Sequence, residues 1–275
     1  MPSSRRSLRV RAPVPEDGAP RVIVAENPEA LAEEASELLL ACLAERVEAR
    51  GRARMILAGG TTPRRTYSLL ASGIAARGLP VRALAWFFGD ERWVTPLDPQ
   101  SNECMARATL LGPIGAPEDT IHSWNAGAGD PVECAGRYGQ ALRTALQGEV
   151  PDVLLLGVGP DGHTASLFPG AAAWLPDGRK VPVGPRLSTE HAAAAIRGGS
   201  SPGWRLTLCP DILGSARHVV FIASGADKAD AVRRAVNGDA DTPAAWIRGT
   251  TTTFIVTRDA AGAGDTGYSV DIRHA

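Results

Sequence analysis

Short, mainly apolar segments that each end in a glycine-containing loop constrain the fold of this chain most strongly. They occupy residues 54–58, 84–88, 152–158 and 217–224, and residues 21–25 and 251–257 are further strand candidates. Patterns typical of amphipathic helices separate them, at 28–50, after Pro63, from about Ser101, at 132–146 and after Lys228. Strands that are apolar along their whole length have both faces covered. The sequence therefore predicts a doubly wound α/β fold, with a mostly parallel sheet and helices on both faces.

Composition divides the chain into one domain and two tails. No long linker or repeat interrupts residues 21–261, so we predict a single α/β domain there. Residues 1–20 are rich in Arg and Pro and are expected to be a disordered tail, and residues 262–275 a polar tail. Residues 176–203 are rich in Gly, Pro, Ser and Ala, and we expect them to form an exposed excursion.

Charge and hydropathy exclude several classes of protein. Lys plus Arg number 29 and Asp plus Glu 30, giving a net charge of -1, so no general positive field exists for nucleic acid. No segment is long and apolar enough for a membrane span, and no secretory signal is recognised. We therefore expect a cytoplasmic protein without nucleic-acid or membrane partners. The four cysteines form no C-x-x-C pair and are expected to be free thiols, mostly buried.

Four loops with chemically reactive residues follow the predicted strands, at 59–63, 89–93, 159–163 and 225–228. In an open α/β sheet, ligands bind beyond the carboxyl ends of the strands, where such loops converge. We therefore expect the four loops to share one rim and to form one site.

The first of these loops, Gly59-Gly60-Thr61-Thr62, suits a phosphate group. Glycines allow close backbone approach, threonine hydroxyls donate hydrogen bonds, and the following helix offers free N–H groups. An ordinary helix cap would have the same composition, so the loop alone leaves both interpretations open.

The second and fourth loops contribute charge. Arg92 could clamp a phosphate or carboxylate, and Asp90 with Glu91 could accept sugar hydroxyls or form a solvated charge run. Lys228 stands at a predicted helix start, where a cation does not help the helix, and this position favours anion binding.

His163 is the most informative of the five histidines. A neutral imidazole is a natural general base near neutral pH, and the glycine-rich loop leaves it accessible to a substrate. The alternative is a buried histidine with a structural role.

Two further motifs are misleading. Residues 157–162 satisfy G-x-G-x-x-G, but Pro160 removes an N–H that would face a pyrophosphate, which argues against a dinucleotide site. Residues 199–203 satisfy G-x-S-x-G, but no apolar strand precedes Ser201 and a proline follows it. We therefore predict no nucleophilic serine there.

Taken together, these motifs resemble those of the 6-phosphogluconolactonases, whose superfamily includes the glucosamine-6-phosphate deaminases. The resemblance rests on residues 57–63, 86–94, 101–102, 159–169, 205–208 and 225–228. The deaminases carry a glutamate at the position of Phe168 and a tyrosine at that of Arg92, so the lactonases are the better match. The alternatives are an amino-sugar-phosphate deaminase or isomerase, and a regulatory module that binds a sugar phosphate without turning it over.

The resemblance implies hydrolysis of 6-phospho-D-glucono-1,5-lactone to 6-phosphogluconate in the oxidative pentose phosphate pathway. It implies no metal or organic cofactor and a small sugar-phosphate partner. We also expect a monomer or weak homo-oligomer. His163 would act as the base, and Asp161 would orient it or cap the turn. Backbone N–H groups of residues 159–162 would stabilise the oxyanion. The substrate-binding residues would be Gly59, Gly60, Thr61, Thr62, Asp90, Arg92, Gly159, Gly162 and Lys228.

Overall fold

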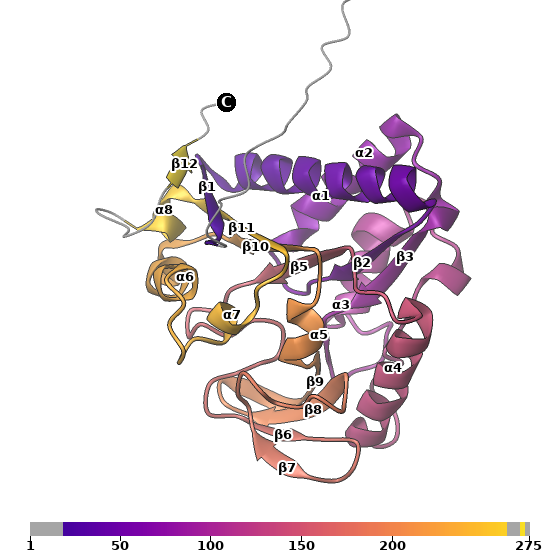
Figure 1. Cartoon of the computed structure of the whole chain (residues 1–275), viewed down its shortest axis with the longest axis vertical. Coiled ribbons are helices and arrows are strands. Elements are labelled where there is room, and N and C mark those ends of the chain that lie inside the picture. The colour runs from indigo at the N-terminus through magenta and orange to yellow at the C-terminus, as the bar shows by residue number, and fades with distance from the viewer. Residues whose placement is uncertain (1–18, 263–269, 273–275) are drawn as a thin grey trace, which may run out of the picture.

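A seven-stranded parallel sheet forms the centre of the protein (Figure 1). The computed structural model describes residues 19–262 and 270–272. Every strand pairing in this sheet is parallel. In order across the sheet the strands are β12 (Val270–Ile272), β1 (Arg21–Ala25), β11 (Thr251–Thr257), β10 (His218–Ala223), β5 (Val153–Gly157), β2 (Ala53–Leu57) and β3 (Leu84–Phe88). The predicted doubly wound α/β fold is confirmed.

Helices and a second sheet cover the two faces of this central sheet. Figure 1 shows α1 and α2 above it, and α4, α5 and the second sheet below. The helices are α1 (Pro28–Arg50), α2 (Pro63–Arg77), α3 (Asn102–Ala106), α4 (Pro131–Leu146), α5 (Pro210–Gly214), α6 (Ala229–Val236), α7 (Pro243–Trp246) and α8 (Arg258–Ala261). Short 3₁₀ turns lie at Val81–Ala83, Glu118–Thr120 and Ala226–Lys228, and one π turn at Arg107–Leu111.

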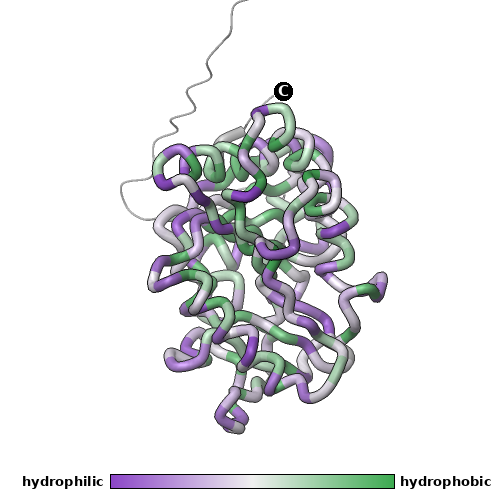
Figure 2. Tube along the Cα trace, turned by 90° about the vertical axis from the view of Figure 1, so that its right-hand side faces the viewer, coloured by the Kyte–Doolittle hydropathy of each residue, from purple (hydrophilic) through white to green (hydrophobic). Residues whose placement is uncertain are grey.

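Helix α1 begins and ends where its sequence predicts. The Asn27 side chain accepts a hydrogen bond from the backbone N–H of Ala30 at 3.0 Å, and Pro28 occupies the first turn. Gly51, with φ of +70°, closes the helix through its N–H to the Val47 carbonyl. One face of α1 is buried in the core through Leu31, Ala35, Leu39 and Leu43. Along the trace, hydrophobic residues concentrate in the body of the molecule and hydrophilic residues at most outer turns (Figure 2).

The second sheet is antiparallel and contains part of the segment predicted to be an exposed excursion. Its strands, in order, are β4 (Asp90–Arg92), β9 (Ser201–Leu208), β8 (Ala193–Gly198), β6 (Ala172–Trp174) and β7 (Lys180–Pro182). Residues 193–196 are buried, so the prediction of an exposed excursion over 176–203 is wrong for β8.

Small side chains explain why β8 is buried although its sequence is only weakly hydrophobic. A methyl group placed on Gly139 of α4 would lie 3.4 Å from the Ala192 methyl group and from the Ala193 backbone nitrogen. The helix and the strand therefore pack at close range through glycine and alanine. An alanine side chain is only weakly hydrophobic, so a run of alanines does not stand out in the sequence as a buried strand, although it is buried in the fold.

The C-terminal segment differs from the prediction. Residues 270–272, expected in a polar tail, form β12 and pair in parallel with β1 at the sheet edge. The predicted N-terminal tail lies outside the described residues, except Ala19 and Pro20. All four cysteines are free and three are buried, which confirms that expectation. Within the described part of the chain, no helix is long and apolar enough to cross a membrane.

Candidate functional site

A pocket of about 530 Å³ lies between the two sheets, at the carboxyl ends of β2, β5 and β10. All four predicted loops contribute to it. Nine of the predicted residues line it: Gly59, Gly60, Thr61, Thr62, Asp90, Arg92, Gly159, His163 and Lys228. Strands β2 and β5 are neighbours in the sheet, but the next strand after β2 is β3 on one side and the next strand of the sheet after β5 is β10 on the other. Doubly wound folds bind ligands in the crevice that forms at such a change of direction.

The Gly59–Thr62 loop connects β2 to α2 and opens toward the pocket. Behind it, the Tyr67 hydroxyl donates to the Ala58 carbonyl at 2.8 Å, which anchors the end of the strand. The Thr62 side chain makes no capping hydrogen bond, although it precedes the helix. The alternative of an ordinary side-chain cap is therefore not realised, and the helix N-terminus remains available to an anion.

His163 and Asp161 form a hydrogen-bonded pair at the edge of the pocket. The Nδ1 atom of His163 lies 2.5 Å from Oδ1 of Asp161, and the same oxygen accepts the backbone N–H of His163 at 3.1 Å. Burial tends to raise the pKa of Asp161, but the hydrogen bonds from His163 and Ser200 outweigh it, and the pKa is lowered. An ionised carboxylate only accepts, so the neutral form of the ring carries its proton on Nδ1 and its lone pair on Nε2.

The imidazole ring is held by close packing on two sides. Its centroid lies 4.4 Å from that of Phe168, with the ring planes at 38°. On another side, a methyl group on Gly159 would lie 2.0 Å from Nδ1 of His163, so only glycine leaves room for the ring. Ala165, two residues after His163, has a φ of +47°. Strained backbone conformations of this kind are frequent at functional sites.

The 159–162 turn has fewer backbone N–H groups available for an oxyanion than predicted. Two of its backbone N–H groups are used within the turn: that of Gly159 donates to the His163 carbonyl at 2.8 Å, and that of Gly162 to the Gly159 carbonyl at 3.0 Å. Pro160 has no N–H. Gly162 also lies outside the pocket lining and faces Thr242. The pocket lining therefore does not support Gly162 as a binding residue, and the oxyanion site in this turn stays a prediction that depends on the N–H group of Asp161.

The Asp90-Glu91 pair divides into two environments. Glu91 is 3% exposed and accepts four hydrogen bonds, from the backbone N–H groups of Arg92, Asn102 and Glu103 and from the Ser101 hydroxyl. Burial nevertheless raises its pKa. Glu91 thus caps the start of α3 and is not part of a solvated charge run.

Asp90, in contrast, lines the pocket. Its Oδ2 accepts from the Ser166 hydroxyl at 2.7 Å, and its Oδ1 from the Asn102 amide at 3.1 Å. These contacts hold the carboxylate on the pocket wall.

Three cationic side chains line the pocket: Arg92, Arg205 and Lys228. Arg92 donates to the Gln100 carbonyl at 2.5 Å, and Lys228 lies 3.2 Å from Asp227. Arg205 belongs to the segment 205–208 on which the resemblance rests, although the sequence alone gives it no role. It lies opposite Arg92 across the β4–β9 pairing, and its guanidinium lies over the Phe168 ring at 5.8 Å. Burial lowers the pKa of Arg205. Only the tertiary pairing of β4 with β9 brings the two arginines together.

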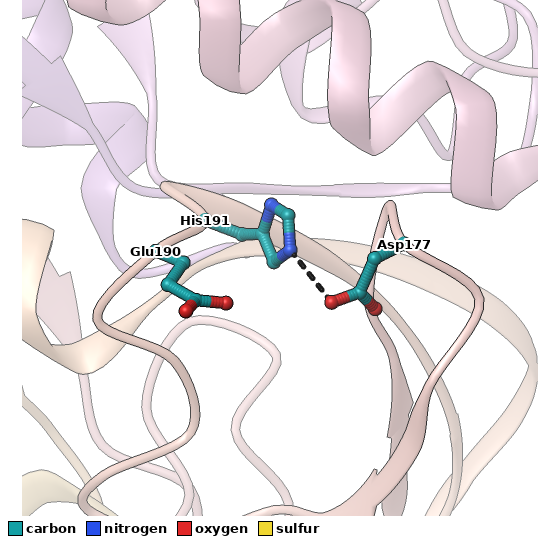
Figure 3. Close-up of side chains that lie close together, drawn as sticks. All are labelled: Asp177, Glu190 and His191. Atoms are coloured by element: carbon teal, nitrogen blue, oxygen red, sulfur yellow. Dashed lines mark hydrogen bonds and ion pairs between the residues drawn. The ribbon is translucent and has the colours of Figure 1, made fainter.

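Asp177, Glu190 and His191 form a second titratable group, outside the pocket lining (Figure 3). Each offers a ligand atom within 4.8 Å of the others, and His191 points its Nε2 toward Asp177 at 3.1 Å. Arg179 already bridges the two carboxylates, at 2.6 Å from Asp177 and 2.9 Å from Glu190. The two carboxylates are thus already paired with a side-chain cation.

Most of the chain matches one known protein family. The family model described as glucosamine-6-phosphate isomerases/6-phosphogluconolactonase matches residues 26–256, which include both sheets apart from β1, β12 and the last residue of β11. The chain belongs to this family. The resemblance inferred from the sequence motifs is thereby confirmed.

Curated relatives of this isomerase/lactonase family cover most of the chain. The 6-phosphogluconolactonase of Synechocystis sp. is 36% identical over 229 residues, covering 81% of this chain and 88% of the relative. That of Streptomyces coelicolor is 33% identical over 257 residues, covering 89% and 94%.

Solved structures agree with the fold. The 6-phosphogluconolactonase of Leishmania guyanensis superposes with a TM-score of 0.72 at 27% identity, covering 89% of this chain and 98% of that one. The enzyme of Trypanosoma brucei gives 0.72 at 27% identity, covering 88% and 97%. A monomeric glucosamine-6-phosphate deaminase gives 0.73 at 23% identity, which shows the shared fold alone.

Proposed function

We propose that this chain hydrolyses 6-phospho-D-glucono-1,5-lactone to 6-phosphogluconate, the lactone step of the oxidative pentose phosphate pathway, with His163 as the general base. The observation that carries the mechanism is the His163–Asp161 pair at the edge of a pocket lined by three cations. The curated relatives at 33–36% identity are lactonases by name and support the same reaction.

The reaction requires one proton to move twice. Nε2 of His163 takes a proton from water as the water oxygen attacks C1 of the lactone. When the tetrahedral intermediate collapses, the bond between C1 and the ring oxygen breaks, and the imidazolium returns the proton to that oxygen. Asp161 fixes the tautomer that leaves Nε2 free and stabilises the imidazolium between the two transfers.

The cationic part of the pocket serves to bind the phosphate group. Lys228, Arg92, Arg205 and the Gly59–Thr62 loop are the groups that would hold it, and Asp90 lines the same pocket. A lactone is an activated ester, so positioning by a remote phosphate provides much of the acceleration that is needed.

Phe168 favours lactone hydrolysis over deamination. Its ring packs 4.4 Å from the imidazole, at the position where the deaminases carry a glutamate. An apolar ring there can hold the imidazole but cannot accept or donate a proton. Ring opening and isomerisation of an amino sugar therefore lack a group that the deaminases have.

A substrate comparison tests this assignment. Purified protein is given freshly generated lactone in one assay and glucosamine 6-phosphate in another, and lactone loss and ammonia release are measured. We expect accelerated lactone loss and no ammonia. Ammonia release would favour the deaminase, and binding of 6-phosphogluconate without turnover of either compound would favour the regulatory module. A cytoplasmic location and a monomeric or weakly associating state are further parts of the proposal.

A further inference from the structure

The turn between β8 and β9 reaches the catalytic pair from the second sheet. Gly198 and Ser201 pair with each other, which leaves Gly199-Ser200 as a two-residue loop. Gly199 has a φ of +66°, and a methyl group on it would lie 2.7 Å from Cβ of Phe168. The loop is therefore seated directly on the residue that packs against the His163 ring, and Ser200 lines the pocket.

Ser200 completes the hydrogen bonding of Asp161. Its hydroxyl donates to Oδ2 at 2.8 Å, while Oδ1 accepts from the ring and backbone nitrogens of His163. The two oxygens of one carboxylate are thus held by two segments that are far apart in the sequence. This arrangement opposes rotation of the carboxylate about its Cβ–Cγ bond, which would otherwise carry Oδ1 away from Nδ1.

We propose that Ser200 is a positioning residue for the lactonase reaction, acting on His163 through Asp161. The inference rests on the proposed roles of His163 and Asp161. It gives a function to a segment outside the four loops that the sequence singled out, and it makes the second sheet part of the catalytic apparatus.

The geometry distinguishes this role from that of a nucleophile. In a nucleophilic triad the serine donates to the histidine, whereas here the serine donates to the aspartate and the histidine faces the pocket. Residues 199–203 also form a hairpin turn that enters β9, not the strand-to-helix turn of a nucleophile elbow. This backbone agrees with the prediction that the G-x-S-x-G motif at 199–203 contains no nucleophilic serine.

A double-mutant cycle with Ser200→Ala, Asp161→Asn and the double variant tests the proposal, with Ser200→Thr as the conservative variant. Ser200→Ala is expected to lower kcat about tenfold with KM changed less than about twofold, because the substrate-binding groups stay in place. Ser200→Thr, which keeps the hydroxyl, should restore most of kcat. In the Asp161→Asn background, Ser200→Ala should have no further effect, since its target is already altered.

Thermal midpoints confirm that each variant is folded, and Ser72→Ala, an exposed serine on α2, controls for the loss of a hydroxyl elsewhere. The same fall in kcat with Ser200→Ala in both backgrounds would overturn the proposal, because the serine would then act independently of Asp161. If Ser200→Ala keeps the wild-type kcat while Asp161→Asn has a lowered kcat, the proposed role of Ser200 is refuted and that of Asp161 stands. Wild-type kcat in Asp161→Asn would instead refute the proposed role of Asp161.

Discussion

Replacing Gly159 with alanine would place a methyl group where the His163 imidazole now lies. The added carbon would be 2.0 Å from Nδ1 and 2.1 Å from Cε1 of His163, and 2.8 Å from Oδ1 of Asp161. Gly159 does not have a positive φ, so the backbone accepts alanine and the ring must move instead. Moving Nδ1 from 2.0 Å to an ordinary contact distance of 3.4 Å requires a displacement of about 1.4 Å, and a misplacement of about 1 Å can already cost about 10²-fold in rate.

The Gly159→Ala variant is therefore expected to remain folded and to lose about two orders of magnitude in kcat. The assay generates lactone from glucose 6-phosphate with its dehydrogenase and measures lactone loss against the spontaneous rate. Thermal unfolding measured in parallel shows whether the fold is intact. Gly184→Ala is the matched control, because Gly184 also lacks a positive φ and a methyl group there would contact nothing within 4 Å. If the folded Gly159→Ala protein keeps the wild-type kcat, the position of the imidazole does not determine the rate and the reasoning is refuted.

Three further predictions concern charge. Lys228→Ala and Arg205→Ala should each raise KM more than they lower kcat in steady-state assays, and an unchanged KM would remove that residue from the phosphate site. Glu91→Ala should lower the free energy of unfolding in urea by about 2–4 kcal/mol, because it leaves the donors that cap α3 without an acceptor; a loss below about 0.5 kcal/mol would contradict this. Because the pKa of Asp161 is lowered, its carboxylate stays ionised as the pH falls into the ordinary range of an aspartate, so the ratio of kcat/KM in wild type to that in Asp161→Asn should stay constant from neutral pH down to that range, and a ratio that falls at pH values well above that range would contradict this.

The central sheet and the meeting of the loops could be predicted because their signals are local. Strands such as β2 and β5 are apolar along most of their length, and glycine lies at or just beyond the end of each. Parallel topology then brings their carboxyl ends together whatever the side chains of the intervening segments. That is why the sequence alone could assign His163 and the Gly59–Thr62 loop to one pocket.

The remaining features depend on contacts between distant segments, which leave no local pattern. In the sequence, Glu91 has the pattern of an exposed charge run, and only the fold brings the first N–H groups of α3 to its carboxylate. Ser200 and Arg205 enter the pocket only through the antiparallel pairing of β9 with β4 and β8. The burial of β8 depends on Gly139 of α4, a small residue far away in the sequence.

Turnover of the lactone by wild type, His163→Ala and His163→Gln tests the central claim most directly. Lactone loss is followed against a reaction without enzyme, since the lactone also hydrolyses unaided. The proposed mechanism predicts clear acceleration by wild type and a loss of about 10²–10⁴-fold in kcat in both variants, with thermal midpoints near that of wild type. Wild-type turnover in both folded variants would show that His163 is not the base.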